Sequence, residues 1–136
     1  MKMPIGQLLA YPVTQCSYDL AAFAPDRSTA ALSSADMVWF CTQYVTQASE
    51  LDDPLCSPLL ADLAGLPPAV VVSAEFDVLS PQVLAFVERC RAAGSTVEHH
   101  AYSGMFHGFF SLAPIIAQAE NAVESATRSY LALTTP

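Results

Sequence analysis

The sequence predicts an α/β fold: a small parallel sheet of about three strands, at residues 7–13, 69–75 and 96–102, with helices on both faces. Residues 69–75 form a nearly all-apolar run rich in valine, which is typical of a parallel strand buried on both faces. A helical pattern follows from Ser80 to Ala93, and a second β-type run then covers residues 96–102. A β-α-β unit of this kind makes the two strands parallel, with a right-handed crossover.

The composition describes one apolar, acidic domain, residues 1–136. The hydrophobic fraction is 53% and the charged fraction 13%, whereas typical domains carry about 25% charged residues. One interpretation of this high apolar and low charged content is that the chain is a buried core piece of a larger protein. With a net charge of −8 and only 5 Lys and Arg, the chain has nothing that would hold a phosphate backbone or an anionic membrane surface.

The cysteines and the N-terminus indicate a cytoplasmic, soluble protein. Four cysteines show no Cys-x-x-Cys spacing and no zinc-ligand spacing to a histidine, so we expect buried free thiols in a reducing compartment: Cys16, Cys41, Cys56 and Cys90. The first apolar run is too short for a signal peptide, and no segment approaches the ~20 apolar residues of a transmembrane helix.

The N-terminal half begins with a strand, a loop and one helix. Residues 7–13 form a short apolar strand that ends near Pro12, because proline cannot donate to a β-ladder. Residues 14–31 are irregular and predict a loop. A helix capped by Ser33 or Ser34 follows, with a stripe at helical spacing made of Met37, Cys41, Tyr44, Val45 and Ala48. Trp39 and Phe40 either pack in the core or between helices, or belong to a helix that roofs a pocket.

Two further helices are expected in the C-terminal half. Ser80 and Pro81 predict a cap followed by proline in the first turn, and Gly94 suits the left-handed position that closes this helix. Its predicted buried face consists of Val83, Phe86, Val87 and Cys90. The last helix runs from Ile115 to about Leu133, with a stripe made of Ile116, Ala119, Val123, Ala126 and Tyr130.

Asp77 and His107 follow directly on the two strands of the β-α-β unit. Because parallel strands lie roughly 5 Å apart, the two side chains can meet at the sheet edge where open α/β folds place their sites. In nucleophilic hydrolysis, a histidine takes a proton from a hydroxyl and an aspartate fixes its tautomer. On spacing alone, a loop Asp and a loop His without chemistry are an equal alternative.

No nucleophile for this pair is recognisable, since Gly-x-Ser-x-Gly does not occur in the sequence. Ser73, Ser103 and Cys56 do not sit at a strand-to-helix elbow, which makes them poor candidates. His99 and His100 are neighbours on one strand and face opposite sides, so they cannot chelate a metal together, and we expect at least one to face solvent.

Three segments together resemble the C-terminal part of hormone-sensitive-lipase-like α/β-hydrolases, which are carboxylesterases: LPPAVVVSAEFDVL at 66–79, RAAG at 91–94 and YSGMFHGF at 102–109. Residues 7–13 are similar to the strand that follows the family's nucleophile region. The resemblance implies that Asp77 is the triad acid and His107 the triad base. It implies that the helix from Ser34 to about Thr46, within 14–65, completes the cap and the substrate pocket. Substrate-binding residues would be Trp39, Phe40 and Phe106, with Phe106 against the histidine.

The sequence departs from that family in two places. After the acid, the usual proline and later acidic residue are replaced by Val78 and Ser80-Pro81-Gln82. The family's Gly-Asp-Ser-Ala-Gly elbow and His-Gly-Gly-Gly oxyanion loop lie upstream of the first strand seen here, and this chain contains neither. The chain therefore resembles a partial α/β-hydrolase fold, the last three strands of an eight-stranded sheet.

Two functional hypotheses follow. The first is a carboxylic ester hydrolase acting on small, short-acyl esters, in which this chain contributes Asp77 and His107 and the serine comes from sequence not present here. The second is a catalytically inactive, truncated remnant that acts as an interaction or oligomerising module. Neither implies a metal or an organic cofactor. Because strand 7–13 lacks its family neighbour, we expect a homodimer or a complementing chain at that edge, or poor solubility.

Overall fold

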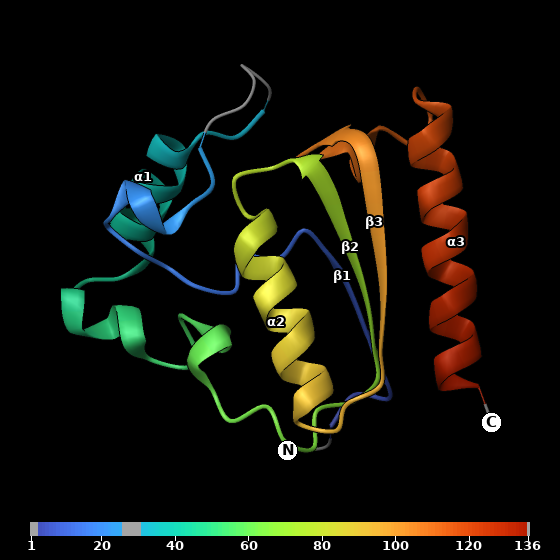
Figure 1. The fold of residues 1–136 in the computed structure, drawn as a ribbon, viewed down its shortest axis with the longest axis horizontal. Helices are drawn as coiled ribbons and strands as arrows, with labels where there is room; N and C mark the ends of the chain where they lie inside the picture. The colour runs from blue at the N-terminus through green and yellow to red at the C-terminus, as the bar shows by residue number, and fades with distance from the viewer. Residues whose placement is uncertain (1–2, 26–30, 136) are drawn as a thin grey trace.

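The computed structural model, which describes residues 3–25 and 31–135, has one three-stranded parallel sheet in the order β1-β2-β3 (Figure 1). The strands are β1 (Gln7–Ala10), β2 (Ala69–Phe76) and β3 (Val97–Phe106). The α-helices are α1 (Ser34–Tyr44), α2 (Ser80–Ala92) and α3 (Ala117–Thr134), and four short 3-10 helices are η1 (Leu20–Ala22), η2 (Ala48–Asp52), η3 (Pro58–Leu60) and η4 (Phe109–Leu112). The predicted fold class is confirmed. Part of the predicted loop 14–31, residues 26–30, lies outside the described residues.

The three strands run in one direction, so their carboxyl ends share one edge of the sheet (Figure 1). Strand β1 is shorter than predicted, because the chain turns at Tyr11, whose φ is 37°. Strand β3 continues to Phe106, past a register shift opposite residues 74–76 of β2. At that shift the Gly104 amide donates to the Glu75 carboxylate over 2.8 Å, so Glu75 supplies a local hydrogen bond between the strand ends.

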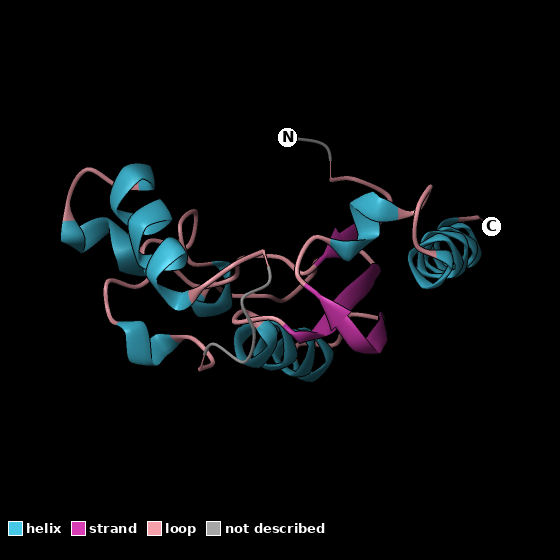
Figure 2. Ribbon diagram, turned by 90° about the horizontal axis from the view of Figure 1, so that it is seen from above, coloured by secondary structure: helices cyan, strands magenta, loops and turns pink. Residues whose placement is uncertain are grey.

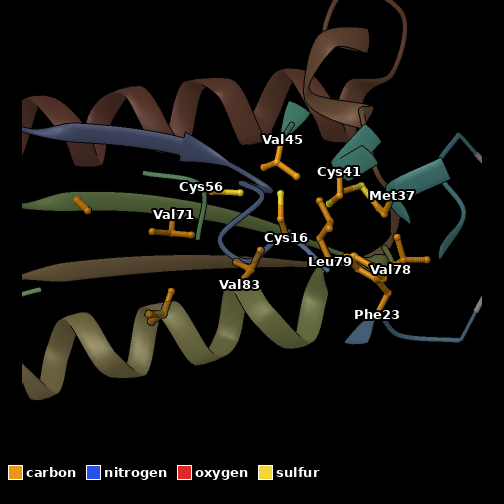
Figure 3. Close-up of a cluster of buried hydrophobic side chains, with 12 residues drawn as sticks. Cys16, Phe23, Met37, Cys41, Val45, Cys56, Val71, Val78, Leu79 and Val83 are labelled. Atoms are coloured by element: carbon orange, nitrogen blue, oxygen red, sulfur yellow. The ribbon is translucent and has the colours of Figure 1, made fainter. Parts of the chain in front are cut away.

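The two faces of β2 pack against different helices, as the all-apolar run predicts. On one face, Val71 packs with Val83 of α2 and Met37 of α1, and Figure 3 shows this cluster. On the other face, Val70 and Val72 pack with three fully buried alanines of α3, at positions 119, 122 and 126. Figure 2 looks along the molecule from above and shows helices on both sides of the strands. Each face thus has its own core.

Helix α1 differs from its predicted stripe. A capping box between Ser33 and Asp36 starts the helix, and Met37 and Cys41 are buried as expected. Tyr44, however, is 69% exposed, and Ala48 is exposed within η2. The helix ends at Tyr44 and the next residue is extended, so helical spacing no longer applies beyond that point.

Helices α2 and α3 also start differently from the predictions. The N-cap of α2 is Leu79, and the Ser80 hydroxyl instead donates to the Ala74 carbonyl over 2.6 Å. The predicted buried face of α2 is confirmed, and Gly94 closes the helix with φ 88°. Helix α3 starts at Ala117 and buries Ala122 in place of the predicted Val123. No helix in the described part of the chain is both long and apolar enough to span a membrane.

Candidate active site

Asp77 is the first residue after β2, and His107 is the first residue after β3. Their side chains meet, with His107 Nδ1 2.9 Å from Asp77 Oδ2. The Asp77 side chain is 1% exposed and the His107 side chain 25% exposed. The pair therefore combines a buried acid with a partly open imidazole, at the sheet edge where the sequence places it.

The turn after β2 holds the Asp77 carboxylate in place. Its second oxygen, Oδ1, accepts the Leu79 amide over 2.9 Å, and the Asp77 carbonyl accepts the Ser80 amide over 3.1 Å. Hydrogen bonds of this turn are thus present although its residues differ from the family pattern. An ionised carboxylate can only accept a hydrogen bond, so Nδ1 of His107 must donate to Asp77 and carries the proton of the neutral imidazole. Nε2 is then the free base, which is the arrangement that general-base chemistry needs.

A third side chain, which sequence reasoning missed, lies on the histidine. The Tyr11 ring packs against the His107 ring, with centroids 4.4 Å apart and planes at 55°. Tyr11 is the first residue after β1, just as Asp77 and His107 follow β2 and β3. The sequence signal that could have identified Tyr11 is its place near the end of a predicted strand, at the same end of the sheet as Asp77 and His107. Phe106, expected against the histidine, ends β3 and packs beside the cluster of Val70 and Val72.

Trp39 and Phe40 stand apart from this pair. Both are on α1, with 57% and 49% of their surface exposed, and their rings pack edge to face 5.1 Å apart. This exposure rules out the interpretation that they are core residues. Phe40 lines an apolar cavity of about 530 Å³ with Val13 and Tyr44, and neither Asp77 nor His107 is among its lining residues.

The other histidines form two separate hydrogen-bonded pairs on opposite faces, as predicted. His99 Nε2 lies 2.8 Å from the Ser73 hydroxyl, and burial followed by the nearby Arg91 charge lowers the pKa of His99. His100 Nε2 lies 3.1 Å from the Glu98 carboxylate and 3.2 Å from the Ser129 hydroxyl. Both histidines are half-buried, with Arg91 of α2 near His99 and Ser129 of α3 beside His100, so neither is fully buried and neither is fully open to solvent.

No nucleophile stands beside His107 in the described residues, where its one side-chain hydrogen bond goes to Asp77. Ser73 is engaged by His99 inside the sheet, and Cys56 is buried. Among the same residues, no group of three or more His, Cys, Asp or Glu is arranged to hold a metal ion. The site as it stands therefore offers an oriented base and an acid.

All four cysteines are free and buried, as predicted. Three of them lie close together next to α1, where Cys41 and Cys56 neighbour the Cys16 thiol (Figure 3). Burial first, and these two thiols second, raise the pKa of Cys16 far above its usual value. Thiols in such surroundings stay protonated and are poor nucleophiles.

Comparison with known proteins identifies a matching family and several similar proteins. Residues 1–111 match the model of a family described as alpha/beta hydrolase fold. The carboxylic ester hydrolase LipN of Mycobacterium tuberculosis is 34% identical over 134 residues, which cover 94% of this chain and 35% of LipN. The ethyl acetate hydrolase of Pseudomonas putida is 31% identical over 121 residues, covering 88% of this chain and 38% of that enzyme.

Solved structures show the same likeness. EstE1, a thermophilic and thermostable carboxylesterase cloned from a metagenomic library, superposes with a TM-score of 0.85 at 36% identity, covering 97% of this chain and 46% of EstE1. A thermostable esterase from Pseudomonas putida gives 0.86 at 34% identity, covering 96% and 43%. The chain thus spans between 35% and 46% of the length of these four proteins.

Proposed function

The chain belongs to the α/β-hydrolase fold family, and on that premise we propose that it is the part of a carboxylic ester hydrolase that carries the acid and the base of a Ser-Asp-His triad. The observation that supports this most directly is the 2.9 Å contact between Asp77 and His107 at the carboxyl ends of neighbouring parallel strands. Relatives named as ester hydrolases, at 31–34% identity, favour ester hydrolysis as the reaction and small esters as substrates.

In the proposed reaction, His107 Nε2 removes the proton of a serine hydroxyl as that oxygen attacks the ester carbonyl. The resulting imidazolium is stabilised by the Asp77 carboxylate at Nδ1. His107 then returns the proton to the departing alcohol, which leaves an acyl-enzyme. Water enters, gives its proton to Nε2, and releases the acid and the serine in the reverse sequence of steps.

We place the source of the serine at the open edge of β1. The amides of Gln7 and Tyr11 donate to β2 carbonyls over 2.8 and 2.7 Å, so the alternate amides of Leu8 and Ala10 point away from β2. An apolar edge of this kind is a template for another strand. A serine-bearing segment, in the same polypeptide or in a complementing chain, is the proposed partner.

The substrate pocket is proposed on α1. Phe40 borders the apolar cavity together with Val13 and Tyr44, and the Trp39 ring packs against the Phe40 ring. Exposed aromatic side chains next to an apolar cavity suit the acyl or alcohol part of an ester. Phe106 is the third proposed substrate contact, because it directly precedes His107. The likeness to hormone-sensitive-lipase-like enzymes supports the same assignment.

The decisive experiment grafts this chain into EstE1 in place of the part it matches, so that EstE1 supplies the remaining sequence. We expect the graft to hydrolyse p-nitrophenyl acetate and butyrate. His107→Ala should reduce turnover by several powers of ten. The matched control is His100→Ala, on the strand that ends directly before His107, and it should retain turnover. A folded graft with equal activity in both variants would show that His107 is not the base.

The second candidate function is an inactive interaction module. The described residues hold no nucleophile at His107, and the β1 edge is open, which together favour this alternative for the chain alone. Hydrolysis by the isolated chain equal to that of His107→Ala and of buffer, with a dimer in analytical ultracentrifugation, would support it. Turnover by the isolated chain that His107→Ala abolishes would instead mean that an unrecognised nucleophile of this chain, or one from a second copy, completes the site.

We also propose the cytoplasm as the location. The four cysteines are all free and buried, which suits a reducing compartment. Thiol counting on protein freshly extracted under alkylating conditions tests this: four alkylated thiols after unfolding are expected, and a disulfide would contradict the proposal.

A further inference from the structure

Each strand of the sheet ends one residue before a side chain of the site. Tyr11 follows β1, Asp77 follows β2 and His107 follows β3. Strand β2 separates β1 from β3. The Tyr11 ring nevertheless reaches the His107 ring, at 4.4 Å between centroids, across the end of the central strand. The contact is therefore made by a side chain that is directed along the sheet edge.

The backbone at Tyr11 explains that direction. Its φ is 37°, in the left-handed region that an aromatic L-residue rarely adopts. The Tyr11 amide still donates to the Val72 carbonyl over 2.7 Å, so the residue is held to β2 while the chain turns away. Strained backbone of this kind persists where its surroundings enforce it, and it concentrates at functional sites.

The Tyr11 ring is itself anchored. It lies 6.1 Å from the Phe109 ring, and Phe109 is fully buried and packs 5.4 Å from Tyr102. The imidazole of His107, in contrast, stands between the end of β3 and Gly108, whose φ is 88°. The Asp77 bond holds the ring at Nδ1 only, which leaves it free to pivot about that bond. A ring packed against the imidazole restricts the pivot.

We propose that Tyr11 is a positioning residue for His107. Its ring holds the imidazole in the orientation that keeps Nδ1 on Asp77 and leaves Nε2 directed to the place of the nucleophile. The consequence for catalysis rests on the proposed function, but the consequence for the imidazole does not. The competing explanation is that Tyr11 merely fills space on Phe109, in which case its loss would leave the state of His107 unchanged.

The test uses the whole chain and reads His107 directly. Long-range ¹⁵N–¹H spectra of the imidazole report which nitrogen carries the proton. In the wild-type chain and in Tyr11→Phe, which keeps the ring, we expect one tautomer protonated at Nδ1. In Tyr11→Leu, which removes the ring and keeps a bulky side chain, we expect a mixture of tautomers. A wild-type tautomer in Tyr11→Leu would overturn the proposal.

A second variant guards against misfolding. Tyr11→Gly removes the ring and also relieves the left-handed backbone, so it should fold at least as well as Tyr11→Leu by thermal unfolding. If Tyr11→Leu unfolds, a folded Tyr11→Gly decides the question, with mixed tautomers expected and a single wild-type tautomer contradicting the proposal.

Kinetics in the EstE1 graft give the catalytic readout. Misplacing a reacting group by about 1 Å can lower the reaction rate around a hundredfold. Tyr11→Leu should therefore lower kcat by roughly 10- to 100-fold with KM little changed. Tyr11→Phe, which keeps the ring, should retain the kcat of the unaltered graft. If the unaltered graft folds but is inactive, the proposed function fails, while the spectra of the chain still decide the role of Tyr11.

Discussion

The two outer strands of the sheet, β1 and β3, form lateral edges that contrast in chemistry. The β3 edge is polar: Glu98 accepts from the Ser129 hydroxyl over 2.6 Å and lies 3.1 Å from His100, and these contacts, the serine first, lower the pKa of Glu98. The β1 edge is apolar: Leu8 is 37% exposed and is flanked by Ile5, which is 70% exposed. Charged side chains keep a sheet edge from pairing. Strand β3 carries Glu98, whereas the described residues of β1, Gln7–Ala10, include no charged side chain.

The contrast separates the side of the sheet that carries the acid and the base from the side with an open strand. The acid and the base stand at the ends of β2 and β3, next to the polar edge, and a hydrogen bond joins their side chains. The open β1 edge is the side from which we propose that the nucleophile comes. Tyr11 joins the two sides, because it leaves β1 and packs against His107.

The largest effect is expected at the acid–base pair. Asp77→Asn in the EstE1 graft should lower kcat by about 10⁴, as the equivalent change does in serine proteases, because an amide favours the wrong tautomer of His107. Glu98→Gln, on the polar edge, removes a carboxylate that does not contact the pair and serves as the control. Steady-state hydrolysis of p-nitrophenyl butyrate measures both, and equal losses in the two variants would contradict the assignment of Asp77.

The next effect concerns stability. Phe109 is fully buried beside Tyr11 and Tyr102, so Phe109→Ala should destabilise the fold by about 3–5 kcal/mol through lost burial and the cavity left behind. Phe40, nearly half exposed on the open side, is the matched phenylalanine, and Phe40→Ala should cost less than ~1 kcal/mol. Urea unfolding gives both values. Similar losses at the two positions would mean that Phe40 is covered in solution.

A smaller effect is expected on assembly. Lysine at a sheet edge opposes pairing, so Leu8→Lys should weaken any self-association about tenfold, or ~1.4 kcal/mol. Ala101→Lys places the same charge on an exposed position of β3 and should leave association unchanged. Sedimentation over a range of concentrations measures the dissociation constants. If Ala101→Lys alone disrupts the dimer, the copies meet at the polar edge.

The smallest effect is a pH dependence. Burial, and then Arg91, lower the pKa of His99 from its usual 6.5 in the folded chain. Below pH 6.5 the unfolded chain therefore binds more protons, so this contribution to stability is complete above pH 6.5 and is lost as the pH falls through the folded value. Urea unfolding between pH 8 and 5 should show the decline, and His99→Gln should reduce it. An unchanged slope in His99→Gln would assign the decline to other groups.

Local pattern accounts for much of the fold. The valine run at 69–75 predicts β2, and the spacing of Val83, Val87 and Cys90 predicts the buried face of α2. The approach of Asp77 to His107 is predictable too, because a right-handed crossover between adjacent parallel strands brings their ends together. In each case the cause lies in side-chain periodicity or in the geometry of one β-α-β unit.

The wrong expectations share a different cause. The sequence predicts Ser80 as the N-cap of α2. In the structure the turn after β2 makes Leu79 the N-cap, and the Ser80 hydroxyl donates to the Ala74 carbonyl. Tyr44 fits the α1 stripe, but the helix ends before its face can be covered. Neither outcome is encoded in spacing, because each depends on where the backbone turns relative to neighbouring elements.

What the sequence alone determined is therefore the family resemblance, the α/β class and the pair Asp77–His107, since contiguous patterns and one crossover specify them. The tertiary structure alone decided the place of Tyr11. Its contact with His107 requires β1 to lie beside β2 and the backbone to turn left-handed at φ 37°. Both conditions arise from packing between segments far apart in the chain, which local periodicity does not record.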